Sequence, residues 1–202
     1  MLVIGLTGSI GTGKTTVAEF LKKQNISVIS SDDIVDQLYH NEAVDVIGNF
    51  FPETIQNNKV NKYYLLEILQ KYPEKLDILE KIVHPMVRLN EKKLLYEMFY
   101  RGEKIVFFDT PLLFEKKKEY LFDAVVVVTC SFETQRNRVL SRKNYTEEKF
   151  RFILSKQINE KDRISRADYV LNTEGKIEAI GIEIQKMLKY IIDISDFKKQ
   201  NA

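Results

Sequence analysis

The chain has 202 residues, of which 44% are hydrophobic and 30% charged, so it is long enough for one domain with an inserted lobe and too apolar for disorder. Its net charge of only +2 argues against nucleic acid as a partner, because proteins that bind nucleic acid usually carry a clear basic excess. One cysteine, Cys130, excludes an internal disulfide. No uncharged apolar run is long enough to span a membrane, so we expect a cytoplasmic protein with no membrane partner.

Five short apolar runs predict the buried strands of a parallel sheet. Helical patterns separate these runs, and strands that alternate with helices indicate βαβ units with helices on both sides of the sheet. The predicted fold class is therefore a three-layer α/β/α fold with a five-stranded parallel sheet. The runs cover residues 2–7, 26–29, 105–108, 124–129 and 169–171.

The first strand leads directly into residues 8–15, which fit the pattern G-x-x-x-x-G-K-[ST] in full. Glycines let the backbone curl so that several N–H groups point into one concavity, and the following helix, expected over 15–23, adds partial positive charge. Lys14 would bind the β- and γ-phosphates of ATP, and the Thr15 hydroxyl would ligate Mg²⁺. The motif predicts a P-loop fold with ATP contacts from Gly8, Gly11, Thr12, Gly13, Lys14, Thr15 and Thr16.

The second strand ends in two serines and two aspartates, residues 30–33. Open parallel sheets bind ligands at the carboxyl ends of their strands, so Asp32 could accept a proton from an acceptor hydroxyl. Alternatively, Asp32 is the N-cap of a helix that begins near Ile34. Position alone leaves both interpretations open.

The long gap between the second and third strands predicts an inserted helical lobe, with helical patterns over 63–71 and 86–100. His84 precedes Pro85 within this gap. Proline disfavours the α conformation of the residue before it, so we expect one helix to end at this point. The residues alone favour a structural role for His84.

The third strand ends at Asp109, followed by Thr-Pro-Leu-Leu-Phe-Glu. An acid at that edge suits a direct or water-mediated contact with Mg²⁺, and the alternative is a turn residue before Pro111. The next helical stretch, 132–166, is rich in Arg and Lys and predicts a lid. Arg138 and Arg142 are four residues apart and would share a helix face that neutralises the transferring phosphoryl group. The alternative is a solvated face paired with nearby Glu147, Glu148 and Glu160.

Guanine specificity is not supported by the sequence. A regulatory GTPase would need a glycine at the third place after Asp109 and an N-K-x-D motif, and the one Asn-Lys pair, Asn61-Lys62, lies in the helical lobe. A small-molecule kinase fits better. The alternatives are another P-loop kinase, such as one that acts on nucleoside monophosphates, and a nucleotide-binding regulator without catalysis.

Several motifs in chain order together resemble the dephospho-CoA kinase family, over residues 6 to about 175. They are the phosphate loop at 5–16, Val-Ile-Ser-Ser-Asp at 28–32, Leu-Glu-Lys-Ile-Val-His-Pro at 79–85, Asp-Thr-Pro-Leu-Leu-Phe-Glu at 109–115, Gln135 with Arg138 and Arg142, and Arg-Ala-Asp-Tyr-Val-Leu-Asn-Thr-Glu-Gly at 166–175. One departure is Ser30, where the family often has an acid.

The resemblance implies transfer of phosphate from ATP to the ribose 3′-hydroxyl of 3′-dephospho-CoA, with Mg²⁺ as cofactor. It implies a single domain with its core at 1–32, 103–131 and 167–202, an inserted helical CoA-binding lobe at about 33–102 and a helical lid at about 132–166. We expect a monomer or a weak homo-oligomer.

The resemblance also implies roles for individual residues. The catalytic residues would be Asp32 as base, with Lys14, Arg138 and Arg142. The turn from Asn172 to Gly175 would lie near the adenine of ATP. The remaining residues would bind dephospho-CoA, and one of them, Asp109, would also bind the metal; they are His84, Arg88, Asp109 and Leu113.

Overall fold

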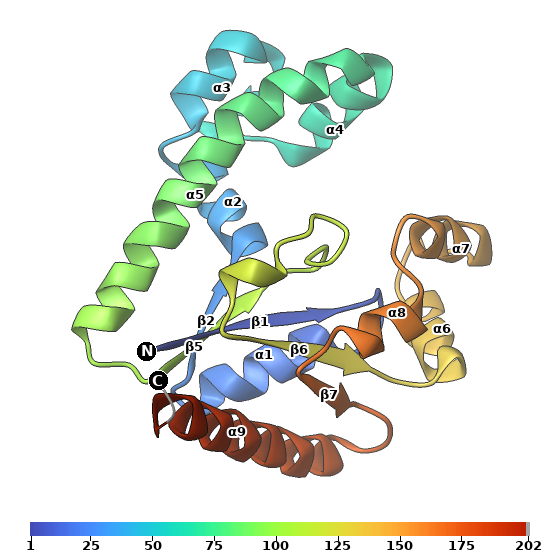
Figure 1. Ribbon diagram of the computed structural model, residues 1–202. Coiled ribbons are helices and arrows are strands. Elements are labelled where there is room, and N and C mark those ends of the chain that lie inside the picture. The colour runs from blue at the N-terminus through green and yellow to red at the C-terminus, as the bar shows by residue number, and fades with distance from the viewer. Residues whose placement is uncertain (201–202) are drawn as a thin grey trace. The chain divides into compact units, whose positions relative to one another are not determined.

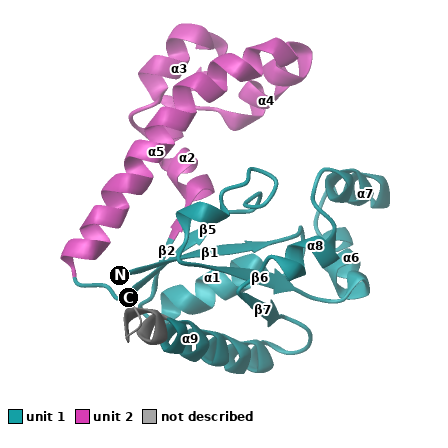
Figure 2. Ribbon diagram, viewed as in Figure 1, with its two compact units in different colours: residues 1–28, 102–202 teal, residues 29–101 magenta. Residues whose placement is uncertain are grey.

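The computed structural model describes the backbone of residues 1–200 and the side chains of residues 1–194 (Figure 1). The chain forms two compact units (Figure 2). The first unit comprises residues 1–28 and the chain from residue 102 onward, and the second comprises residues 29–101. Each unit has its own set of helices and strands, and each is described separately below.

The first unit is built on a five-stranded sheet in the order β2-β5-β1-β6-β7. The pairs of β1 with β5, β1 with β6 and β6 with β7 are parallel, and each strand begins and ends within one residue of its predicted apolar run. The predicted fold class, a parallel five-stranded sheet with flanking helices, is confirmed. The strands are β1 (Leu2–Gly8), β2 (Ser27–Ser30, whose last two residues fall in the second unit), β5 (Ile105–Asp109), β6 (Ala124–Thr129) and β7 (Tyr169–Asn172).

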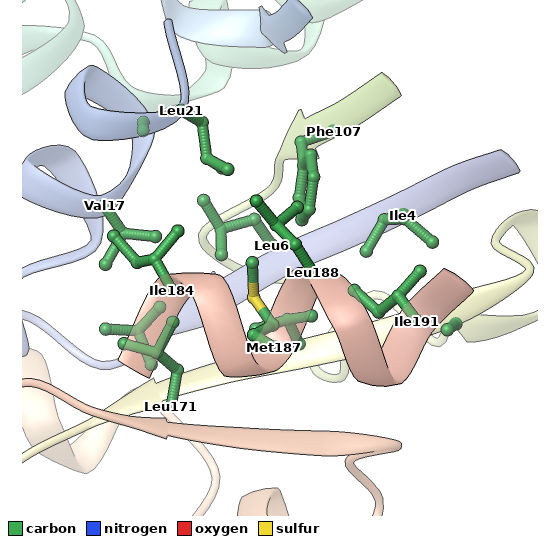
Figure 3. Close-up of a cluster of buried hydrophobic side chains, with 14 of the residues drawn as sticks. Ile4, Leu6, Val17, Leu21, Phe107, Leu171, Ile184, Met187, Leu188 and Ile191 are labelled. Atoms are coloured by element: carbon green, nitrogen blue, oxygen red, sulfur yellow. The ribbon is translucent and has the colours of Figure 1, made fainter. Parts of the chain in front are cut away.

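Two helices, α1 (Lys14–Lys23) and α9 (Ile177–Gln200), cover one face of this sheet (Figure 1). Figure 3 shows Val17 and Leu21 of α1 and Met187 of α9 beside Ile4 and Leu6 of β1. Each such side chain contributes about 1.5–3 kcal/mol when it leaves water completely. This cluster is the main core of the first unit, and it fixes the start of α1 at the end of β1.

The four consecutive valines of β6 are buried on both faces of the sheet. Val126 and Val128 belong to the cluster under α1 and α9. Val125 and Val127 point to the opposite face, where they pack with Leu113 and Phe114. Successive side chains of a strand alternate between the two faces, so a strand buried on both faces needs an apolar residue at every position.

The segment 132–166, expected as a lid, forms three helices that belong to the first unit. They are α6 (Phe132–Leu140), α7 (Glu147–Ser155) and α8 (Glu160–Ser165). Ser131, Thr146 and Asn159 precede the three helices, and each accepts a hydrogen bond from a first-turn backbone N–H. These caps satisfy part of the donors that a helix start leaves unpaired, and they explain the helix boundaries.

The second unit, residues 29–101, is mainly helical, and it also contains a small hairpin that the sequence interpretation missed. Asn57 and Asn58 link the two hairpin strands with φ angles of 49° and 57°, a backbone region that asparagine tolerates well. The elements are α2 (Ser31–His40), α3 (Val44–Phe50), β3 (Ile55–Gln56), β4 (Lys59–Val60), α4 (Lys62–Lys71) and α5 (Leu76–Tyr100), with short 3-10 helices at Pro52–Thr54 and Pro73–Lys75.

The expectation that a helix ends at Pro85 is wrong, because α5 runs from Leu76 to Tyr100 with Pro85 inside it. Pro85 cannot donate to the carbonyl of Lys81, and Lys81 is exposed, where water can serve that carbonyl. Val83 and Val87 on either side are buried. Burial of this apolar face outweighs the local preference of the residue before proline.

Within residues 1–200, no helix combines the length and the apolar character that crossing a membrane requires.

Candidate functional site

The phosphate loop connects β1 to α1 at the carboxyl edge of the sheet. Strand β1 lies between β5 and β6. The connection from β1 runs to one side, to β2, whereas the connection from β5 crosses to the other side, to β6, and such a reversal is where open α/β sheets bind ligands. Gly11 and Gly13 have φ angles of +78° and +90°, which side chains with a Cβ rarely adopt. Gly13 is the N-cap of α1, and no side chain caps that helix. Its first-turn N–H groups are therefore available to an anion.

Lys14 and Asp109 form an ion pair at this edge. Their side chains are 14% and 16% exposed, so the pair is largely shielded from water. The sheet register sets Asp109 opposite Leu6, two residues before the loop begins. Thr15, the next residue of α1, is exposed. The structure thus brings two of the predicted site residues into contact and leaves the Thr15 side chain at the surface.

Arg138 contacts Thr173, the residue directly after β7. Its Nη1 lies 3.0 Å from the Thr173 hydroxyl, and its Nη2 lies 2.8 Å from the Thr173 carbonyl oxygen. The Thr173 hydroxyl is completely buried and donates to the carbonyl of Thr12 at 2.6 Å. Sequence reasoning missed Thr173, which connects the phosphate loop to β7 and α6, because this contact joins residues 161 positions apart.

The helical argument that linked Arg138 to Arg142 is wrong. Helix α6 ends at Leu140, so Arg142 lies beyond it, exposed and with its guanidinium 5.9 Å from the centre of the Tyr145 ring. Glu147, an expected acidic partner of this basic segment, pairs with Arg136 at 2.7 Å. Partial burial works against ionisation of Glu147, but hydrogen bonds and charge from Arg136 and Arg151 lower its pKa overall.

The turn after β7 is fixed by its own side chains. Asn172 accepts a hydrogen bond from the backbone N–H of Glu174 at 2.8 Å, and Gly175 has a φ angle of +90°. The Glu174 carboxylate accepts from the Thr134 hydroxyl and from the Ser131 backbone N–H. These two bonds, the Thr134 bond above all, lower the pKa of Glu174. The turn therefore has a defined shape, and Glu174 connects it to the start of α6.

In the second unit, Asp32 lies exposed in the first turn of α2. The N-cap of that helix is Ser30, whose hydroxyl accepts from the backbone N–H of Asp33 at 3.1 Å. The alternative interpretation of Asp32 as the N-cap is therefore wrong. Ser30, the departure from the family pattern, serves as the cap, and the Asp32 carboxylate is not used for capping.

His84 and Arg88 share one exposed face of α5. Because the helix continues through Pro85, these residues are one helical turn apart, and both are exposed. One turn further, Glu91 accepts a hydrogen bond from the Ser31 hydroxyl at 2.6 Å. Ser31 directly precedes Asp32, so the second unit holds its predicted site residues on two contacting helices, α2 and α5.

A model of the dephospho-CoA kinase family matches residues 2–179. The chain belongs to the dephospho-CoA kinase family. A relative named dephospho-CoA kinase, from Bartonella quintana (strain Toulouse), is 42% identical over 179 residues, which cover 88% of this chain and 92% of the relative.

Two solved structures extend the comparison. TT1252 from Thermus thermophilus has a TM-score of 0.75 and 30% identity and covers 95% of this chain and 96% of its own. A dephospho-CoA kinase from Campylobacter jejuni has a TM-score of 0.67 and 24% identity, with 94% and 96% covered, and this likeness supports the fold alone.

The segment 109–115 contributed to the resemblance to dephospho-CoA kinases, and two of its residues make structural contacts. Leu113 is completely buried and packs with Phe114 and Val127, so its side chain is part of the core, and its contact with substrate stays a prediction. Glu115 accepts a hydrogen bond from the Ile158 backbone N–H at 3.0 Å. It also contacts Arg163, whose side chain is only 2% exposed. This end of the motif holds segment 132–166 against the sheet.

Proposed function

We propose that the protein transfers the γ-phosphate of ATP to the ribose 3′-hydroxyl of 3′-dephospho-CoA and so performs the final step of CoA synthesis. The observation that carries this proposal is the family match over residues 2–179, which includes both the phosphate loop and the His84 region. The geometry of the loop supports the ATP half of the reaction, since α1 begins there with uncapped N–H groups.

ATP would bind with its β- and γ-phosphates at the N-terminus of α1 and at the Lys14 ammonium. Lys14 would then exchange its bond to Asp109 for bonds to phosphate. The turn from Asn172 to Gly175 would border the adenine. This assignment is supported by the defined shape of the turn and by its hydrogen bonds to the start of α6.

Mg²⁺ is the proposed cofactor, with Thr15 and Asp109 as its protein ligands. A hydroxyl and a carboxylate are the hard oxygen donors that Mg²⁺ prefers, and the ion usually takes few protein ligands beside phosphate and water. The described side chains contain no cluster of three or more His, Cys, Asp or Glu that could hold a metal by itself. This donor set fits an ion that arrives with the nucleotide, and bound Mg²⁺ would neutralise charge on the β- and γ-phosphate oxygens.

Asp32 would orient the acceptor hydroxyl and take its proton, and His84 and Arg88 would bind the dephospho-CoA. The exposure of these three side chains supports the assignment. Arg138 and Arg142 would neutralise the transferring phosphoryl group. A guanidinium has five N–H donors, so the two bonds from Arg138 to Thr173 leave donor capacity for phosphate. On this proposal, residues 33–102 are the CoA-binding lobe and 132–166 the lid of a cytoplasmic enzyme that is a monomer or a weak homo-oligomer.

ADP release with Mg-ATP tests the proposal. The acceptors to compare are dephospho-CoA, nucleoside monophosphates, shikimate and no acceptor. We expect strong stimulation by dephospho-CoA alone. Stimulation by a nucleoside monophosphate instead would favour another small-molecule kinase, and slow ADP release unaffected by every acceptor would favour a nucleotide-binding regulator.

A further inference from the structure

Three polar side chains connect the phosphate loop to segment 132–166. The Ser9 hydroxyl lies 2.8 Å from Nε2 of Gln135, in α6, and 2.7 Å from Oε1 of Gln157, which lies between α7 and α8. The same Gln135 nitrogen lies 2.7 Å from the carbonyl oxygen of Ile10. Ser9 is 5% exposed and Gln135 is 7% exposed. Buried polar groups require hydrogen-bond partners, so these contacts constrain the loop.

The Ile10 carbonyl fixes the direction of the two hydrogen bonds of Gln135. A backbone carbonyl can only accept, so the Gln135 atom beside Ile10 must be the amide nitrogen. Its second proton goes to the Ser9 oxygen, which leaves the Ser9 proton free to be donated to Gln157. The structure therefore requires a donor at position 135, and at position 157 it has an acceptor, the Oε1 atom of Gln157.

Helix α6 also packs directly on the backbone of the loop. A Cβ added at Gly11 would lie 2.9 Å from the Gln135 carbonyl oxygen and 2.6 Å from a methyl of Val139. The first half of the loop is thus held from outside, by α6, while Thr12 bonds back to Ser9 from within the loop at 2.9 Å. A loop held in its binding shape does not lose conformational freedom when the ligand arrives, so affinity increases.

We propose that Gln135 and Gln157 are positioning residues for the phosphate loop, which act through Ser9 and set the affinity for ATP. This inference rests on the proposed role of the loop in ATP binding. Without the connection, the free loop samples other conformations and must be ordered again when ATP binds. Bound phosphates restore the shape of the loop. Removing the connection should therefore raise KM for ATP and leave the rate of the chemical step little changed.

The test uses Gln135→Leu and Gln157→Leu in the full chain, with Gln185→Leu as the matched control. Gln185 also bonds across two elements, to Gln24 at 2.9 Å, but on the exposed side of α1 and α9. We expect KM for ATP, and Kd for a fluorescent ATP analogue, to rise roughly three- to tenfold in Gln157→Leu, the usual effect of one lost neutral hydrogen bond. The rise should be at least as large in Gln135→Leu, which loses two bonds. KM and Kd of the control, and kcat of all three variants, should stay within about twofold of the wild-type values. A change of that size is smaller than the usual effect of a lost hydrogen bond.

Two further variants test the direction of the bonds. Gln157→Glu keeps an acceptor for Ser9, whereas Gln135→Glu removes both donated bonds. The first should lie closer to wild type than Gln157→Leu. The second should bind ATP at least as weakly as Gln135→Leu, because it loses both donated bonds and adds a negative charge where salt screens little. A residue that only packs would lower the melting temperature, leave Kd unchanged and make the two Glu variants alike. That result, or a loss confined to kcat, would overturn the proposal.

This proposal and the proposed function fail separately. If the wild-type protein binds the ATP analogue but dephospho-CoA does not stimulate ADP release, the proposed function fails and Kd values alone judge the positioning role. If dephospho-CoA is phosphorylated normally and Gln135→Leu binds the analogue as tightly as wild type, only the positioning role fails.

Discussion

The ammonium of Lys14 is paired with the carboxylate of Asp109 at the edge of the sheet, and both side chains are largely buried. A buried ion pair is costly to break on one side, because the remaining charge loses both water and its partner. ATP binding supplies Lys14 with new negative partners, its phosphates. The same event would leave Asp109 available to a cation, so nucleotide and metal would enter this site together.

Asp109→Asn tests this coupling. We expect kcat to fall at least about tenfold, and the Mg²⁺ concentration for half-maximal activity to rise several-fold, because the variant lacks a charged metal ligand. Asp36→Asn is the matched control, since it breaks another Lys–Asp pair, with Lys62, whose side chains are about half exposed. Exposed pairs contribute little, so this control should behave as wild type. An unchanged Mg²⁺ requirement in Asp109→Asn would remove Asp109 from the metal site.

Asp32→Asn tests the proposed base. The amide keeps the size of the side chain but cannot take a proton, so we expect kcat to fall by about 10²–10⁴-fold with little change in KM for ATP. Steady-state rates with dephospho-CoA provide the measurement, and Asp36→Asn, one turn further along α2, again serves as the control. Near-normal turnover would exclude Asp32 from proton transfer.

Pro85→Ala should stabilise the second unit. Alanine restores the N–H that can donate to Lys81 and avoids the roughly 3 kcal/mol penalty of proline inside a helix. The unfolded chain gains about 0.4–1 kcal/mol of conformational freedom when proline is removed, which offsets part of that benefit. We expect a net gain of about 2–2.6 kcal/mol in urea unfolding, the difference between the two effects. A loss of stability would mean that the Pro85 ring makes packing contacts worth more than the restored bond.

Glu174→Gln should flatten the acid limb of the stability profile. The pKa of Glu174 is lowered in the folded protein by hydrogen bonds from Thr134 and Ser131. Such a group stabilises the fold at pH values above its ordinary pKa of 4.5, and the contribution is lost as the pH falls through the lower folded value. Melting temperatures between about pH 6 and pH 3 provide the measurement, a range chosen to bracket that transition.

The control for this experiment is Glu178→Gln, which changes an exposed acid at the start of α9. Its acid limb should follow that of wild type. If Glu174→Gln loses stability on acidification as steeply as wild type, the hydrogen bonds of Glu174 do not contribute to the fold at neutral pH.

Much of the fold could be predicted because its signals are local. The valines of β6 mark a strand covered on both faces, and the phosphate loop combines a fixed spacing with a strand before it and a helix after it. The continuous helix through Pro85 could not be predicted from that residue alone, since the burial of Val83 and Val87 decides it. The asparagine pair at 57–58 carried a turn signal that would have indicated the hairpin.

The site was less predictable because its contacts join distant parts of the chain. The bond between Ser9 and Gln157 spans 148 positions, and no spacing rule reaches that far. The helical argument for Arg142 used a four-residue interval that holds only within a helix, and α6 ends before this residue. Leu113 belongs to a motif of the family, and membership in that motif did not predict its burial.

The close approach of Gly11 to α6 has a consequence for how this protein can change. The nearest polar obstacle to a side chain at position 11 is a main-chain oxygen, that of Gln135, which no change of rotamer can move. A side chain at position 11 would therefore require a shift of the whole helix. A chimera that takes its phosphate loop from another kinase would need the matching α6 as well. The two segments would have to change together, although more than a hundred residues separate them.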